Sequence, residues 1–484
     1  MSVLVVGGGI TGLVAARSLA LDGVPVLLAE AGPRLGGKVS TEHADGYTIE
    51  HGPDSFLATR PAGTALVREL GLGEDLVGTA GTRSVYIRHH DRLVPMPDGL
   101  GLVLPTKVLP FARTRLFSWP EKLRMARDIV SPRSMPADDI AVGVFLRRRL
   151  GDPLVERLAG PLVGGVYGTP IDELSLDAVV PTLRTAEREH RSLLFAGLAD
   201  GRKMRAAIAA RAKANPGVKP LGAFVSLRGG LEGLTTALVA SATEGGADLR
   251  TGLGVRRLAR SGAGVVAAFS DGSCTRFDAV VIATPANAAA VLLDEPLPTA
   301  ARRLDGIPHG TSVLVTLAYP RDRVAHDLSG HGYLVPASEG GPIAACTWSS
   351  EKWSGRAPAD TVLLRMFVRD EGAATSLPEP ALVAAARADA ERTLRISSEP
   401  VLVRVARYEH AMPRYTVGHL DRVAQIEAAM DAWPAVTLAG ASYRGVGLPD
   451  CIAQGQAAAR RVAERIAARE ASGEPSIAAA VARG

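Results

Sequence analysis

The stretch SVLVVGGGITG at residues 2–12 decides the fold of this 484-residue chain. Its first five residues form a short apolar run, which is typical of a buried parallel strand. A helical pattern follows the glycines through Leu21, and Val24 to Glu30 has the character of a second strand. The segment therefore predicts a β-α-β unit with a glycine-rich turn between the first strand and the helix.

The spacing Gly7-x-Gly9-x-x-Gly12 is the one that dinucleotide binding requires at such a turn. The first glycine permits the tight turn, the second lets backbone N–H groups approach a pyrophosphate, and the third lets helix and strand pack closely. Glu30 lies 18 residues past Gly12, at the end of the second strand. A carboxylate there can accept both ribose hydroxyls and would repel the 2′-phosphate of NADP. We therefore expect a dinucleotide to contact Gly7, Gly8, Gly9, Ile10, Thr11, Gly12, Glu30 and Ala31.

The segment GPRLGGK at residues 32–38 matches the spacing of an ATP-binding P-loop up to its lysine. Val39 stands where that motif needs Ser or Thr to bind magnesium, and the segment lies inside the unit already assigned, so we reject an ATP site. As the loop after the ribose-binding acid, it offers Arg34 to cofactor phosphates and allows close backbone approach at Gly37 and Lys38. The Arg-x-Gly-Gly extension is typical of flavoproteins rather than nicotinamide dehydrogenases.

Composition excludes several other classes of protein. With 47% hydrophobic and 22% charged residues the chain is an ordinary globular protein, and its length favours two or three domains. The three cysteines form no CxxC pair, and no histidine pair has HExxH spacing. His89-His90 is interpreted as an exposed polar turn rather than a ligand pair, so no metal site is expected. We see no nucleic-acid module, signal peptide or membrane-spanning run, and we expect a cytoplasmic protein that is soluble or peripherally membrane-associated.

Positive charge gathers in the middle of the chain. Residues 111–220 carry 19 Lys and Arg against 12 Asp and Glu, an excess larger than the net charge of +5 of the whole chain. The ordinary explanation is a solvated helical surface. The alternatives are attraction to an anionic membrane surface or to an anionic substrate.

Further motifs identify a family. They are HGPDSF (51–56), EREHRS (187–192), LRGGL (227–231), IATP (282–285), GYLVP (332–336), MPRYTVGH (412–419) and LAGASYRGVGLPDCI (438–452). Together with the glycine-rich turn, they resemble the porphyrinogen oxidases of haem biosynthesis. That set includes protoporphyrinogen oxidase and bacterial coproporphyrinogen III oxidase, within the flavin amine oxidase superfamily. The resemblance covers nearly the whole chain.

The resemblance and the order of the predicted elements imply an α/β fold. A discontinuous Rossmann-type FAD-binding domain is expected from residues 1–85, 221–295 and 430–470. A mixed-sheet substrate-binding domain (86–110 and 296–429) and a mainly helical domain (111–220), a candidate for membrane docking, are inserted into it. Residues 471–484 are expected to fray.

The resemblance also assigns site residues. Besides the residues above, it places FAD contacts on Gly52, Pro53, Asp54, Ser55, Val255, Tyr408, Val446, Gly447 and Leu448, although Tyr408 alone could equally be a packed core aromatic. It implies that Gly165, Tyr167, Tyr333, Leu334 and Met412 line the substrate pocket and that Arg83 meets a carboxylate. His331 stands where relatives often carry Phe, which marks a more polar pocket.

The implied reaction removes six electrons from a porphyrinogen in three hydride transfers to flavin, with molecular oxygen as acceptor and hydrogen peroxide as product. The chemistry is centred on the flavin, and no catalytic side chain is assigned. A polar pocket favours coproporphyrinogen III, which has four propionates, over protoporphyrinogen IX, which has two. The Ala- and Arg-rich, actinobacterial-type composition favours the same substrate. Product handover to ferrochelatase and peripheral membrane contact are further expectations. The rival interpretations are a flavin amine oxidase, a carotenoid desaturase, and a flavin-binding scaffold with little turnover.

Overall fold

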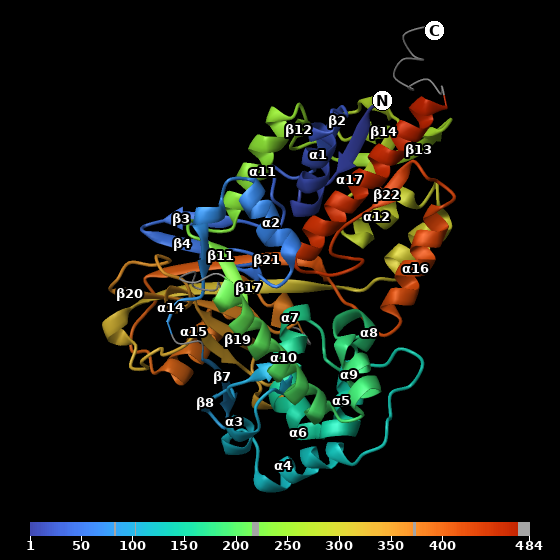
Figure 1. Ribbon diagram of the computed structural model, residues 1–484. Helices are drawn as coiled ribbons and strands as arrows, with labels where there is room; N and C mark the ends of the chain where they lie inside the picture. The colour runs from blue at the N-terminus through green and yellow to red at the C-terminus, as the bar shows by residue number, and fades with distance from the viewer. Residues whose placement is uncertain (82–83, 102, 215–221, 371–373, 473–484) are drawn as a thin grey trace.

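The fold is centred on a five-stranded parallel sheet (Figure 1). The computed structural model describes residues 1–81, 84–101, 103–214, 222–370 and 374–472. The sheet order is β12-β2-β1-β16-β22, so strands from both ends and the middle of the chain lie side by side. The strands are β1 (Val3–Val6), β2 (Val26–Ala29), β12 (Asp248–Arg250), β16 (Ala279–Ile282) and β22 (Val436–Leu438). The predicted β-α-β unit at the start of the chain is confirmed, with α1 (Ile10–Leu21) between β1 and β2.

Both faces of this sheet are buried, which explains why β1 is apolar throughout. Val3 and Val5 belong to one core with α1, α11 (Glu232–Glu244) and α17 (Leu448–Ala471). Leu4 and Val6 belong to a second core on the opposite face. That core is covered by α12 (Ala286–Leu293), α13 (Pro298–Asp305), α16 (His419–Met430) and the antiparallel strands β13 (Val255–Ser261), β14 (Gly264–Phe269) and β15 (Cys274–Phe277). Thus α13 and α16 pack on the parallel sheet, although the sequence assigns residues 296–429 to the substrate side.

A second, seven-stranded sheet has the order β21-β17-β20-β19-β18-β7-β8, and only β18 and β7 run parallel. A β-bulge in the long β17–β21 ladder lies between Gly310 and Ser312, next to the cavity described below. Helix α15 (Glu379–Leu394) packs on one face. The strands are β7 (Val85–His89), β8 (Arg92–Pro95), β17 (His309–Pro320), β18 (Gly332–Leu334), β19 (Ile343–Trp348), β20 (Thr361–Val368) and β21 (Leu402–Pro413).

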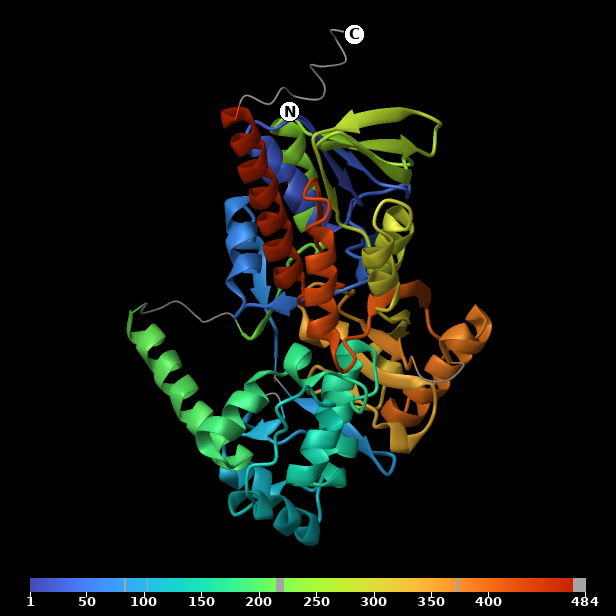
Figure 2. The ribbon, with the colours of Figure 1, turned by 90° about the vertical axis from the view of Figure 1, so that its right-hand side faces the viewer.

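A helical region lies at the end of the molecule farthest from the parallel sheet (Figures 1 and 2). Its elements are α3 (Val108–Arg113), α4 (Trp119–Ala126), α5 (Val142–Leu150), α6 (Asp152–Leu154), the π-helix η3 (Val155–Gly164), α7 (Gly165–Tyr167), α8 (Leu176–Val179), α9 (Thr182–His190) and α10 (Leu193–Ala214). No helix in the described ranges combines the length and apolarity that crossing a membrane requires.

A buried polar network joins these helices. Arg149 pairs with Asp128 at 2.5 Å, and Ser192 Oγ donates to the same carboxylate at 2.7 Å. Glu187 accepts hydrogen bonds from the backbone N–H groups of Ser134 (2.8 Å) and Met135 (2.9 Å). Every charge is therefore partnered, as burial demands. Glu187 and Ser192 of the EREHRS motif thus hold the helices together and do not line the cavity described below.

Short elements complete the chain. Two small sheets and α2 lie between the two large sheets (Figure 1). They are β3 (Thr41–Ala44) with β4 (Tyr47–Glu50), β5 (Phe56–Leu57) with β11 (Phe224–Leu227) and β6 (Leu76–Gly78), and α2 (Pro61–Glu69). The pair β9 (Leu100–Gly101) and β10 (Leu104–Pro105) and helix α14 (Ser349–Lys352) are also present.

Candidate active site

One continuous cavity of about 1000 Å³ joins the parallel sheet to the seven-stranded sheet and the helical region. The carboxyl ends of four parallel strands open into it, through Gly7 after β1, Glu30 after β2, Ala283 after β16 and Gly440 after β22. This is the edge at which open α/β sheets bind ligands. The far wall comes from η3, α7 and the ends of β17, β20 and β21. The volume is at the upper end of the range for small-molecule sites.

Two helices begin at this cavity with uncapped glycine N-termini. Gly9 is the N-cap of α1 and Gly447 the N-cap of α17, and neither helix has a side-chain cap. The backbone N–H groups of a first helical turn have no partner within the helix, so both ends offer donors and positive dipole ends to the cavity. Around Gly9 a Cβ would meet no protein atom within 4 Å, whereas at Gly12 it would lie 1.9 Å from the Gly7 carbonyl oxygen. Gly12 therefore permits packing, and Gly9 leaves room for a ligand.

Two backbone hydrogen bonds hold the side chain of Glu30 in place. Its Oε2 accepts the N–H of Gly8 at 2.7 Å, and its Oε1 accepts that of Gly32 at 2.6 Å. The carboxylate lines the cavity, while neighbouring Ala31 does not. Each carboxylate oxygen retains further acceptor capacity, so the ribose role predicted for Glu30 is compatible with this geometry.

In the loop after β2, the side chain of Arg34 binds carbonyl oxygens of the same loop. Arg34 donates to the carbonyl oxygens of Gly37 (2.5 Å), Val39 (3.1 Å) and Leu35 (3.2 Å), and its side chain does not line the cavity. Gly37 and Lys38 do line it. Burial lowers the pKa of Lys38. Arg34 therefore stabilises the loop, and Lys38 is its cation on the cavity side.

Some residues of the HGPDSF segment line the cavity, and Asp54 stabilises the turn from behind. Gly52, Pro53 and Ser55 line the cavity, and a Cβ on Gly52 would lie 1.8 Å from the Lys38 carbonyl oxygen. Asp54 faces away and accepts hydrogen bonds from Lys352 (2.9 Å) and Trp353 (3.1 Å). Burial alone would raise the pKa of Asp54, but the charges of Lys352 and Arg365 hold it well below its usual range. Asp54 thus fixes the turn as a buried anion.

The two longest family motifs contact each other. Tyr415 Oη donates to the Ala441 carbonyl at 2.7 Å and accepts the N–H of Gly445 at 2.8 Å. His419 stacks on Tyr415, with ring centroids 3.8 Å apart, and its Nε2 lies 2.9 Å from the Tyr443 carbonyl oxygen. The MPRYTVGH motif therefore shapes the loop that leads into α17.

The other predicted cofactor contacts also fall into two groups, those that line the cavity and those that do not. The residues that line the cavity are Gly7, Gly9, Ile10, Thr11, Tyr408, Val446, Gly447 and Leu448. Gly8, Gly12 and Val255 do not line it. Burial raises the pKa of Tyr408, so its hydroxyl stays protonated.

Of the predicted substrate residues that the structure describes, only Gly165 and Met412 line the cavity. Tyr333 is 1% exposed and donates to Asp389 of α15 at 2.8 Å, because alternation along β18 points it to the opposite face of the sheet. Leu334 packs in the helical core. His331 Nε2 lies 2.8 Å from the Ala80 carbonyl oxygen, and the Tyr167 ring lies 6.0 Å from that of Tyr415. Arg83 lies outside the described residues.

Sequence reasoning missed the π-helix η3, which forms much of the far wall. Val155, Glu156, Gly160, Pro161 and Gly164 from this helix line the cavity. π-Helical turns are rare and are frequent at functional sites, because they re-aim side chains. The run GPLVGG at 160–165 was the available signal, since a Pro and three Gly in six residues disfavour a regular α-helix.

Charged groups on the far wall were also missed. Among the residues the structure describes, the cations that line the cavity are Lys38, Arg147 and Arg369. Arg147 pairs with Asp172 and, through Nε, with Asp152 at 3.0 Å, and the hydrogen bond to Asp172 raises the pKa of Arg147. Arg369 donates to the Val335 carbonyl at 2.7 Å. The lining of the cavity is mostly apolar and includes these two arginines.

Comparison with known proteins agrees with this geometry. Residues 10–463 match the family described as flavin containing amine oxidoreductase. The chain is 41% identical to the coproporphyrinogen III oxidase of Propionibacterium freudenreichii subsp. freudenreichii, over 95% of this chain and 90% of that protein. It is 32% identical to the protoporphyrinogen oxidase of Bos taurus, over 95% of this chain and 98% of that protein. A crystal structure of a candidate protoporphyrinogen oxidase from Exiguobacterium sp. 255-15 superposes with a TM-score of 0.82 at 32% identity, covering 95% of this chain and 98% of the other.

Proposed function

Because the chain belongs to the flavin-containing amine oxidoreductases, and within them to the porphyrinogen oxidases, we propose that it is an FAD-dependent coproporphyrinogen III oxidase of haem biosynthesis. Each catalytic cycle would remove two electrons and two protons from the macrocycle. Three cycles would convert coproporphyrinogen III to coproporphyrin III and reduce three molecules of oxygen to hydrogen peroxide. The observation that carries the substrate assignment is the 41% identity, over 95% of the chain, to a protein of that name.

FAD fits the nucleotide side of the cavity. Glu30 would accept the ribose hydroxyls, and the first turn of α1 would bind the pyrophosphate through its unpartnered N–H groups. The open space at Gly9 leaves room for that contact. The first turn of α17, behind Gly447, would face the pyrimidine edge of the flavin ring.

When bound, the flavin supplies the redox chemistry by accepting hydride equivalents from the substrate and transferring them to oxygen. The chain would contribute three effects. The N-terminus of α17 stabilises negative charge at the cofactor edge. The apolar wall of η3 and the ends of β17 and β21 excludes water. Guanidinium groups orient the substrate through its propionates.

Arg147 and Arg369 are the groups we assign to substrate propionates. Arginine is suited to this role because its planar fork binds carboxylates bidentately. The acidic partners of Arg147 are exposed, at 44% for Asp172 and 69% for Asp152, so a propionate can compete for the same guanidinium. Four propionates would use such groups more fully than two. The second candidate, protoporphyrinogen IX oxidation, is favoured by the likeness to the bovine enzyme of that name.

Anaerobic reduction followed by admission of oxygen tests the proposal. Purified enzyme with bound FAD is mixed with coproporphyrinogen III or protoporphyrinogen IX, and loss of flavin absorbance is followed by stopped flow. We expect faster bleaching by coproporphyrinogen III, and then coproporphyrin fluorescence and peroxide once oxygen enters. Faster bleaching by protoporphyrinogen IX would transfer the assignment to the second candidate. Bleaching by neither would favour the flavin-binding scaffold.

The remaining rivals are enzymes of other substrate classes. A flavin amine oxidase would form peroxide with a panel of primary and secondary amines, and a carotenoid desaturase would bleach with polyenes. Neither would be reduced by a porphyrinogen. The same stopped-flow assay with these compounds separates the three.

We further propose that the enzyme works in the cytoplasm and touches an anionic membrane surface through α3 and α4. Apolar side chains there are largely exposed, including Val108 (65%), Trp119 (69%) and Leu123 (68%). The same stretch of chain carries exposed cations at Lys107, Arg113, Arg115 and Arg127. Amphipathic surfaces of this composition bind the lipid headgroup region. Handover of the product to ferrochelatase remains a prediction from the resemblance.

A further inference from the structure

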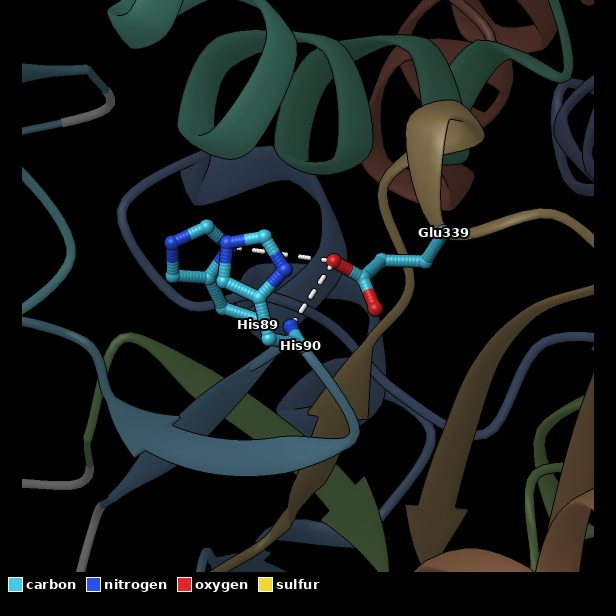
Figure 3. A group of neighbouring side chains, drawn as sticks. All are labelled: His89, His90 and Glu339. Carbon is cyan, nitrogen blue, oxygen red and sulfur yellow. Dashed lines mark hydrogen bonds and ion pairs between the residues drawn. The ribbon is translucent and has the colours of Figure 1, made fainter.

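The β7–β8 hairpin ends in two adjacent imidazoles. His89 is the last residue of β7 and pairs with Arg92 of β8, so His90 and Asp91 form a two-residue turn. Both turn residues have positive φ, 50° and 56°, as a type I′ turn requires. The rings of His89 and His90 lie side by side, with centroids 4.1 Å apart and an angle of 35° between their planes (Figure 3).

A carboxylate from a distant part of the chain faces this pair. Glu339 ends the short helix η5 (Ala337–Glu339), and Figure 3 shows its carboxylate facing the hairpin, with dashed lines to the His89 ring and to the backbone nitrogen of His90. Its Oε1 accepts the backbone N–H of His90 at 3.0 Å and lies 3.7 Å from Nδ1 of His89. One potential ligand atom from each of the three residues lies within 4.8 Å of the others. The sequence showed only the histidines, because Glu339 is 249 positions away from His90.

We propose that His89, His90 and Glu339 bind a divalent transition metal ion of the zinc type. Two imidazole nitrogens and one carboxylate oxygen form a common ligand set for such ions, at roughly 2.0–2.2 Å from the metal. The three atoms lie within 4.8 Å of one another, so they would have to move closer together to share an ion. Mg²⁺ and Ca²⁺ are disfavoured because they select oxygen ligands. Three protein ligands leave at least one coordination position for water.

The surrounding charges are compatible with a cation. The charge of Arg157 acts on His89. Arg157 is itself neutralised by Glu121, with contacts of 2.9 and 3.0 Å. On the other side of the turn, Arg392 lies 3.6 Å from Asp91. The nearby guanidinium groups therefore have acidic partners of their own.

The position of the site suggests what the ion would do. Ala337 and Ser338, which precede Glu339, line the large cavity. An ion held by Glu339 and the hairpin would fix that part of the wall from outside, without contacting the substrate. Such a metal site would be separate from the flavin chemistry and independent of the proposed reaction.

Metal titration of the purified, flavin-loaded enzyme tests the site. After treatment with a chelator, Zn²⁺ is titrated by calorimetry, and Co²⁺ is added as a spectroscopic probe. We expect one equivalent of Zn²⁺ with micromolar or tighter affinity, visible ligand-field bands with Co²⁺, and a melting temperature that rises with the zinc concentration. The variants His89→Gln, His90→Asn and Glu339→Gln should each weaken binding at least tenfold.

The variants are chosen to keep the fold. Asn at position 90 accepts the positive φ of the turn, and Gln at position 339 can still accept the His90 N–H. The control is His43→Gln, which removes an exposed histidine outside the cluster. Melting temperatures without metal should agree among all these proteins. The proposal is overturned if the native enzyme binds no zinc in this range, or if the three variants bind it as the native enzyme and the control do.

Discussion

Glu30 accepts the backbone N–H of Gly8 through its Oε2, with 2.7 Å between the two atoms. A second backbone bond, from Gly32, holds the other oxygen at 2.6 Å. The acid at the end of β2 therefore shapes the glycine-rich turn as well as facing the cavity. A ligand's ribose would meet a carboxylate whose orientation is already fixed.

Replacement of Glu30 by alanine should weaken FAD binding by about 10- to 100-fold, because hydrogen bonds to a charged group contribute roughly 1.5–3 kcal/mol. Fluorescence titration of the apoprotein with FAD measures the change. Glu30→Gln keeps an acceptor and should lose less affinity. Native affinity in the alanine variant would contradict the ribose role.

Gly9 and Gly12 should respond to alanine in opposite ways. A Cβ on Gly12 would lie 1.9 Å from the Gly7 carbonyl oxygen, so Gly12→Ala should cost about 3 kcal/mol of unfolding free energy or prevent folding. Around Gly9, which lines the cavity, a Cβ meets no protein atom within 4 Å. We expect Gly9→Ala to keep the apoprotein's urea midpoint and to lose FAD affinity. Equal destabilisation of both apoproteins would argue against a cofactor role for Gly9.

Arg147→Met should raise the KM for coproporphyrinogen III by about tenfold, because one charge-assisted hydrogen bond to the substrate is lost. The KM for protoporphyrinogen IX should rise less. Steady-state oxygen consumption with both substrates measures the difference. Its neighbour Arg148 is exposed on the same helix and does not line the cavity, so Arg148→Met is the matched control. A similar rise in both variants would point to general surface charge instead of a propionate contact.

His419 should make the fold sensitive to acid. Burial lowers the pKa of His419 to about 4, while in the unfolded chain it is about 6.5. Between these values the unfolded state binds an extra proton, so stability rises with pH. The native protein should lose about 3 kcal/mol through this group between pH 6.5 and pH 4. Urea unfolding at several pH values gives the free energy of unfolding as a function of pH. This free energy should fall less steeply toward acid pH in His419→Gln than in the native protein. An equally steep fall in both would exclude His419 as the sensitive group.

Trp119→Glu combined with Leu123→Glu should abolish pelleting with vesicles that contain phosphatidylglycerol. The change removes two exposed apolar side chains and opposes the anionic surface. Val291→Glu is the control, since Val291 is 73% exposed but belongs to α12 on the parallel sheet. Higher salt should weaken native binding. Pelleting that is insensitive to salt, or equal loss in the control, would count against docking through α3 and α4.

The sequence predicted those parts of the site that depend on local backbone geometry. Gly7, Gly9 and Glu30 are defined by a strand, a turn and a helix within thirty residues, and all three line the cavity. Residues whose side chains depend on distant packing were harder to place. The side-chain direction of Tyr333 depends on the register of β18 between β19 and β7. The hydrogen bonds of Arg34 depend on the backbone conformation of its own loop. The cavity wall formed by η3 follows from a π-helix, for which single-sequence periodicity gives little signal.

The order of the strands in the parallel sheet has a consequence for how the protein matures. β22 pairs with β16, and α17 packs on α1, with a Cβ on Gly455 only 2.5 Å from the Thr11 carbonyl oxygen. A ribosome must therefore translate more than 440 residues before the strand–helix unit at the start of the chain meets its last partners. Such non-local pairing is slow and leaves apolar surface exposed in the meantime. A ligand that binds only the completed fold stabilises it by mass action, so bound flavin would oppose the loss of these last contacts.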